Sequence, residues 1–74
     1  MKNEIVLIYT DYIKLEAALK LANCVESGGE AKAYIQEGKV YVGEEVCLMR
    51  GKKLYDGDSF RFMGKIYTIS KYES

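Results

Sequence analysis

The sequence predicts a small α+β protein in which two short helices pack on a small, mainly antiparallel sheet. A β-branched apolar run opens the chain at residues 4–9, two segments with helical spacing follow, and short segments with a period of two fill the second half. Helices and strands segregated along the chain are typical of this class, because each amphipathic element must bury its apolar side against another layer. The 74 residues are expected to form a single domain spanning residues 1–74.

The first helix is predicted from its apolar spacing in residues 15–23. Apolar positions recur there at i, i+3, i+4 and i+7, which places them on one face of a helix. They are Leu15, Ala18, Leu19 and Ala22. We expect this helix to end near Asn23.

The second helix is predicted from a capping box. Glu30 follows Ser27 by three residues, so the Ser27 hydroxyl can accept from the Glu30 N–H and the Glu30 carboxylate from the Ser27 N–H. The helix is expected to run to about Glu37 and to stop at Gly38. Its inner face is expected to comprise Ala31, Tyr34 and Ile35.

Strands and turns are expected after Gly38. The predicted strands are residues 40–42, 46–48, 60–62 and 66–69. The predicted turns are Gly43 with Glu44, Asp56-Gly57-Asp58, and Gly64 with Lys65, the last of which closes a hairpin.

Composition narrows the function classes. Eleven basic and eleven acidic side chains give a formal net charge of zero, unlike the basic excess of most nucleic-acid binders. The chain has no histidine and no nucleophile with a recognisable partner, so we expect neither an enzyme nor a cofactor.

The cysteines and the apolar run indicate the compartment. Cys24 and Cys47 are expected to be reduced core thiols, since nothing in the sequence points to export. Two thiols without histidine cannot complete a tetrahedral zinc site, so no metal is expected. The apolar run at residues 5–9 is too short to span a membrane, and we expect a cytoplasmic protein.

Two features could contact an anionic partner. Arg50, Lys52 and Lys53 place three positive charges in four residues, which fits a solvated loop or a phosphate-binding one. Gly28 and Gly29 fit a cap with a tight turn, or a helix start to which a phosphate comes close, but not a nucleotide-binding loop, which ends in Lys-Ser/Thr. The candidates for stacking on an exposed base are Tyr12, Tyr41 and Tyr55.

Several short motifs follow one another in a fixed order. They are Lys14-Leu15-Glu16, Leu19-Lys20-Leu21-Ala22, Ser27-Gly28-Gly29-Glu30-Ala31-Lys32, Ile35, Gly38-Lys39-Val40-Tyr41-Val42, Arg50-Gly51-Lys52-Lys53-Leu54 and Gly57-Asp58. In this order, over roughly residues 12–60, they resemble the S4-type RNA-binding domain, also called the alpha-L motif. The chain is similar in particular to the small stand-alone bacterial proteins of the YaaA-like group, which carry the same Ser-Gly-Gly-x-Ala-Lys element and Arg-Gly-Lys-Lys loop.

The resemblance implies the alpha-L RNA-binding fold and a non-catalytic function. The expected ligand is structured RNA, ribosomal or transfer RNA, bound by a basic surface of the two helices and the following β-loop. Ribosomal particles are a further expected partner, in ribosome assembly or quality control. Carried over by position, the RNA-binding residues are Lys14, Lys20, Ser27, Gly28, Gly29, Lys32, Arg50, Lys52 and Lys53.

Three positions depart from the family pattern. Gly28 stands where the wider family usually has arginine, Val42-Gly43-Glu44 where it has Val-Asn-Gly, and Met49 where the narrow group often has an arginine. Each departure removes a potential contact, so we expect a modest affinity or the need for a partner. The alternative is a protein-interaction module without direct RNA binding, which would use an exposed sheet edge.

Overall fold

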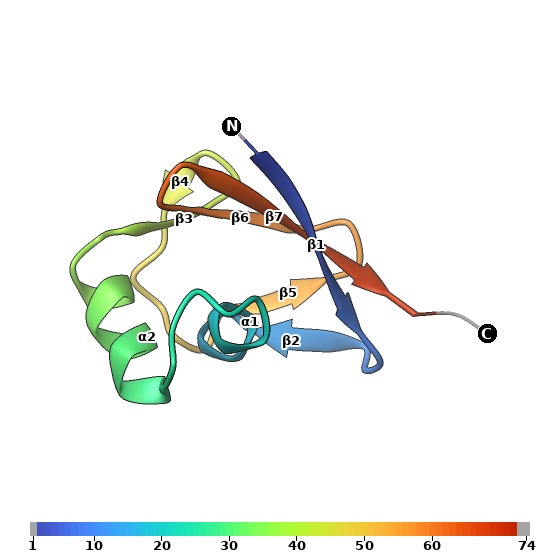
Figure 1. Cartoon of the computed structure of the whole chain (residues 1–74), viewed down its shortest axis with the longest axis horizontal. Helices are drawn as coiled ribbons and strands as arrows, with labels where there is room; N and C mark the ends of the chain where they lie inside the picture. The colour runs from blue at the N-terminus through green and yellow to red at the C-terminus, as the bar shows by residue number, and fades with distance from the viewer. Residues whose placement is uncertain (1, 73–74) are drawn as a thin grey trace.

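The computed structural model describes residues 2–72 as two helices, a five-stranded sheet and a two-stranded ribbon (Figure 1). In sheet order the strands are β1 (Lys2–Ile8), β7 (Lys65–Lys71), β6 (Ser59–Phe62), β3 (Val40–Val42) and β4 (Glu45–Val46). The ribbon consists of β2 (Tyr12–Lys14) and β5 (Lys53–Tyr55). The helices, α1 (Leu15–Leu21) and α2 (Gly28–Gln36), lie with the ribbon on one side of the sheet. The predicted α+β class is confirmed.

The sheet is antiparallel except at one edge. β1 pairs in parallel with β7, from Lys2 opposite Lys65 to Ile8 opposite Lys71. A parallel pair needs a long crossover connection, and both helices, the ribbon and the intervening strands supply it here. The predicted, mainly antiparallel sheet is therefore confirmed, and its β1 edge carries no further strand among residues 2–72.

The end of α1 is fixed by a Schellman motif. The Cys24 N–H donates to the Leu19 carbonyl at 2.9 Å, and the Asn23 N–H donates to the Lys20 carbonyl at 3.0 Å. Asn23 has a φ of 60°, the left-handed conformation that this motif requires. The helix therefore ends at Leu21, two residues before the predicted end.

The start of α2 carries the predicted cap with one changed partner. The Ser27 hydroxyl accepts from the Glu30 N–H at 3.3 Å, as expected. The Glu30 carboxylate accepts from the Glu26 N–H at 3.1 Å, one residue before the predicted Ser27. At the other end, Gly38 takes a φ of 76° and its N–H donates to the Ile35 carbonyl at 3.1 Å. The predicted stop at Gly38 is confirmed.

The β6–β7 hairpin has a two-residue turn. Phe62 pairs with Lys65, so the turn residues are Met63 and Gly64, with φ angles of 51° and 79°. Two positive φ angles define a type I′ turn, whose twist matches that of the flanking strands. The predicted turn at Gly64 with Lys65 was therefore one residue late.

A single core joins the sheet to the helices and the ribbon. Its buried side chains are Val6, Ile8, Leu15, Ala18, Leu19, Val25, Ala31, Ile35, Val40, Leu54, Phe60, Phe62, Tyr67 and Ile69. The predicted inner faces of both helices are confirmed, with Ala22 and Tyr34 half-buried at the margin. The Phe60 and Tyr67 rings stack with centroids 4.8 Å apart.

Both cysteines are free thiols that pack against this core and are half-buried. Burial raises the pKa of the Cys24 thiol, against the opposing effect of its hydrogen bond with Tyr67. Within residues 2–72, no three metal-ligating side chains gather in one place. No helix described here is long and apolar enough to cross a membrane.

Candidate functional site

The basic loop closes over the start of α1. The Leu15 N–H donates to the Lys52 carbonyl at 2.9 Å, and the Glu16 N–H donates to the Arg50 carbonyl at 3.2 Å. The N-cap residue Lys14 makes no side-chain cap of its own. The first amides of a helix lack partners within the helix, so the loop backbone supplies them and is held against α1.

The pairing of β2 with β5 also brings basic side chains together at this end of the ribbon. Lys14 lies directly opposite Lys53 in the β2–β5 register. Like charges in opposite positions destabilise a strand pair, so this arrangement costs the fold stability. We call Lys14, Arg50, Lys52 and Lys53 the basic cluster; all four side chains are exposed. Within residues 2–72 no ion pair joins a member of the cluster to an acid.

Aromatic rings lie beside the basic cluster on the ribbon. Tyr12 lies directly opposite Tyr55, with ring centroids 5.8 Å apart and planes tilted by 48°. The Lys53 ammonium lies 5.0 Å from the centroid of the Tyr12 ring. The third candidate, Tyr41, lies elsewhere on the sheet, where Arg61 covers its ring at 4.7 Å. The structure therefore places Tyr12 and Tyr55 beside the basic cluster and Tyr41 away from it, a difference that the sequence did not indicate.

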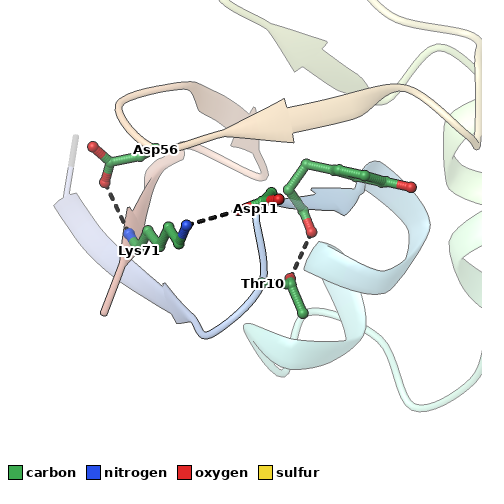
Figure 2. Close-up of polar contacts among 5 residues, drawn as sticks. Thr10, Asp11, Asp56 and Lys71 are labelled. Atoms are coloured by element: carbon green, nitrogen blue, oxygen red, sulfur yellow. Dashed lines mark hydrogen bonds and ion pairs between the residues drawn. The ribbon is translucent and has the colours of Figure 1, made fainter. Parts of the chain in front are cut away.

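The opposite end of the ribbon is acidic. Figure 2 shows Asp11 and Asp56 converging on Lys71 at the end of β7. The Lys71 ammonium lies 2.8 Å from the Asp11 carboxylate, and this hydrogen-bonded ion pair lowers the pKa of Asp11. Asp56 accepts from the Lys71 backbone N–H at 2.8 Å. Asp58 accepts from the Tyr55 N–H at 2.7 Å, which confirms the predicted turn role of these aspartates.

The glycines at the start of α2 are not required by the fold. A Cβ atom on Gly28 would meet nothing within 4 Å, and one on Gly29 only the Ser27 hydroxyl at 3.8 Å. Neither glycine has a positive φ. Within residues 2–72 no hydrogen bond occupies either amide. These amides are open to an approaching group, although the Glu30 carboxylate lies nearby on the Glu26 N–H.

Comparison with known proteins identifies the family. A family model described as S4 domain matches residues 6–70. The chain belongs to the S4 domain family. A curated relative, the "Probable ribosome maturation protein RlbA" of Bacillus subtilis (strain 168), is 44% identical over 57 residues, which cover 77% of this chain and 80% of the relative.

The nine residues carried over for this S4 domain fall into three groups. Lys14, Arg50, Lys52 and Lys53 form the basic cluster, and Ser27, Gly28 and Gly29 form the start of α2. The other two are Lys20 and Lys32, exposed on α1 and α2. No hydrogen bond or ion pair within residues 2–72 joins either lysine to the basic cluster. Lys20 lies about 9 Å along the α1 axis from Lys14, since a helix rises about 1.5 Å per residue.

Sequence reasoning missed two shallow hollows of the S4 domain. One, of about 280 Å³, lies between the β3–β4 turn and the basic loop and is lined by Val42, Glu45, Val46, Cys47, Leu48, Met49 and Lys52. The other, of about 430 Å³, is lined by Ile13, Ala17, Lys20 and Leu21. The apolar residues Val46, Leu48 and Met49 before the basic run are the sequence signal for the first hollow.

Proposed function

We propose that this S4 domain binds structured RNA, ribosomal or transfer RNA, without catalysing a reaction. The observation that carries the proposal is the basic cluster: four exposed cations gathered at one end of the ribbon in a chain with no net charge. Cations held together at a cost to the fold are best explained by an anionic ligand that offsets their repulsion. Phosphates are the anions that a row of Lys and Arg side chains recognises in RNA.

The remaining carried-over residues extend the proposed surface. Gly28 and Gly29 present free amides at the positive end of the α2 dipole, and their lack of side chains lets a phosphate oxygen approach. Lys20 and Lys32 would contact phosphates farther along the ligand. Phosphate contacts fix orientation and carry little sequence information, so the proposed surface recognises the shape of the RNA.

A ribosomal setting is part of the proposal. It rests on the name of the relative, a probable ribosome maturation protein, together with the proposed RNA surface. The expected partners are ribosomal particles or their RNA in the cytoplasm, during assembly or quality control.

Fluorescence anisotropy with ribosomal and transfer RNA fragments, over a series of salt concentrations, tests the proposal. Six phosphate contacts, made by the basic cluster with Lys20 and Lys32, predict that log K falls with log salt concentration with a slope of about −4 to −5. Failure to bind any structured RNA at low salt would rule out the function.

Charge variants test the surface itself. Replacing Arg50, Lys52 and Lys53 by Gln should weaken binding to all RNAs and reduce the slope by about three. The matched control is Lys39→Gln with Lys65→Gln, which removes two exposed charges outside the proposed surface. It is compared with Lys52→Gln and Lys53→Gln made together. An equal effect of both sets would show that only the overall charge matters.

The alternative, a protein-interaction module, is supported by the outer face of β1. Ile5 and Leu7 are 68% and 42% exposed there, on an edge strand without a second neighbour within residues 2–72. Pull-down with nuclease treatment and high salt distinguishes the two functions. A protein partner that survives both treatments and is lost in Ile5→Ser would favour the alternative.

A further inference from the structure

The β2–β5 ribbon has two chemically different faces. Side chains alternate along a strand, so Tyr12 and Lys14 share one face with their partners Tyr55 and Lys53. The other face carries Leu54, which is fully buried in the core. The outward face therefore holds two aromatic rings directly beside two cations.

The tyrosine rings of this face are not used by the core. Tyr12 is 37% exposed and Tyr55 is 49% exposed. Their rings are tilted against each other by 48° and do not stack face to face. The Lys53 ammonium lies near the Tyr12 ring, and the Tyr55 ring is the more exposed of the two.

Charge determines how an anionic strand would cross this face. Lys14 and Lys53 lie toward the start of α1, whereas Asp58 binds the Tyr55 N–H at the other end. A phosphate backbone is attracted to the first end and repelled from the second. The tyrosine pair therefore lies where an anionic strand held by Lys14 and Lys53 would turn away from the acidic end.

We propose that the Tyr12–Tyr55 pair stacks on an unpaired nucleobase while Lys14 and Lys53 hold the adjacent phosphates. This inference rests on the proposed RNA binding and adds the ligand class: RNA with an unpaired nucleotide, in a bulge, a loop or an end. Stacking on aromatic side chains is how proteins bind single-stranded bases, and it tolerates any base because every base has a π face.

The test compares three synthetic RNA hairpins with one shared stem. The first has a short bulge, the second is fully paired, and the third carries abasic sugars in the bulge, which keeps the phosphates and removes the bases. The wild-type chain should bind the bulged hairpin about tenfold more tightly than the other two, the usual effect of one stacked base. Equal binding of the bulged and abasic hairpins would overturn the inference and leave the proposed function standing.

Substitutions locate the stacking site. Tyr12→Leu with Tyr55→Leu should abolish the preference for the bulge, while the corresponding Phe variants, which keep the rings, should retain it. The matched control is Tyr9→Leu with Tyr72→Leu, because this pair is also exposed, with centroids 5.3 Å apart and planes tilted by 44°. Retention of the preference in the Tyr12/Tyr55 double Leu variant would overturn the assignment. Absence of binding to all three hairpins, and to the RNA fragments used above, would overturn the proposed function as well.

Discussion

Gly28 and Gly29 occupy positions where the fold has no need of glycine. Neither has a positive φ, and a Cβ atom fits at both. Glycine in a helix costs about 0.5–1 kcal/mol relative to alanine, so two adjacent glycines at the start of α2 weaken it. The proposed close approach of a ligand to the backbone would give glycine a role here.

The first prediction concerns Gly28, where glycine lowers helix stability but is proposed to let a ligand approach. Gly28→Ala should raise the free energy of unfolding by about 0.5 kcal/mol, because alanine restricts the unfolded chain and fits the native conformation. The same change should weaken RNA binding, because the added methyl group lies where a phosphate is proposed to approach. Urea unfolding and anisotropy measure the two effects.

Gly38→Ala is the matched control for this prediction. Gly38 has a φ of 76°, so alanine is strained there and should lower stability by about 1 kcal/mol without changing RNA affinity. Unchanged RNA affinity in Gly28→Ala would count against the backbone contact at α2.

The second prediction concerns pH. Burial, and then the hydrogen bond with Cys24, raises the pKa of Tyr67 from its ordinary value of 10.0 to about 12. Between these values the unfolded chain loses the phenolic proton and the folded protein keeps it, so the unfolded state binds fewer protons. Stability should therefore be unaffected by this group below pH 10 and should fall as pH rises from 10 to 12.

Urea unfolding at several alkaline pH values measures this dependence. Tyr67→Phe keeps the ring that stacks on Phe60 and removes the titrating hydroxyl. Its stability should fall less steeply between pH 10 and 12. Identical slopes for the two proteins would show that Tyr67 does not cause the decline.

Among the elements, the helices and the hairpin could be predicted from the sequence, but the ribbon could not. A helix of seven or nine residues repeats its apolar spacing over about two turns, and the capping box marks a start. β2 and β5 have three residues each and pair across about forty positions of the chain. Such a short alternation gives no reliable signal, so Lys53 was assigned to a loop and the tyrosine pair was not foreseen.

The third prediction concerns the attachment of the ribbon. Leu54 anchors β5 in the core, and Leu54→Val should lower the free energy of unfolding by about 1 kcal/mol. It should also weaken RNA binding, because it shifts the strand that carries Lys53 and Tyr55. Urea unfolding and anisotropy on the same samples provide the two values.

Ile69→Val is the control at the element scale. Ile69 is equally buried, at 1% exposure, but lies on β7 away from the basic cluster. Ile69→Val should lower the free energy of unfolding by a similar amount and leave RNA affinity unchanged. If both variants weaken binding equally, general loosening of the fold, not the position of the ribbon, controls affinity.

At the scale of the whole molecule, a net charge of zero conceals a separation of charge. The basic cluster lies at one end of the ribbon, while Asp11, Asp56 and Asp58 gather at the other. A composition summed over the chain cannot reveal this, because the separation depends on the pairing of β2 with β5. Gly28 and Met49, where the resemblance leads to the expectation of arginine, are not among the four residues of the basic cluster.

The fourth prediction is that the chain unfolds as one cooperative unit. The ribbon and helices lie on one side of the sheet, yet Leu54 of the ribbon and Ile69 of the sheet belong to one buried cluster. A chain of this size buries too little surface for two independent cores. Amide NMR signals from β5 and from β7 should therefore disappear at the same urea concentration. Loss of the β5 signals at a lower concentration would mean that the ribbon opens by itself, and RNA binding would then include the cost of closing it.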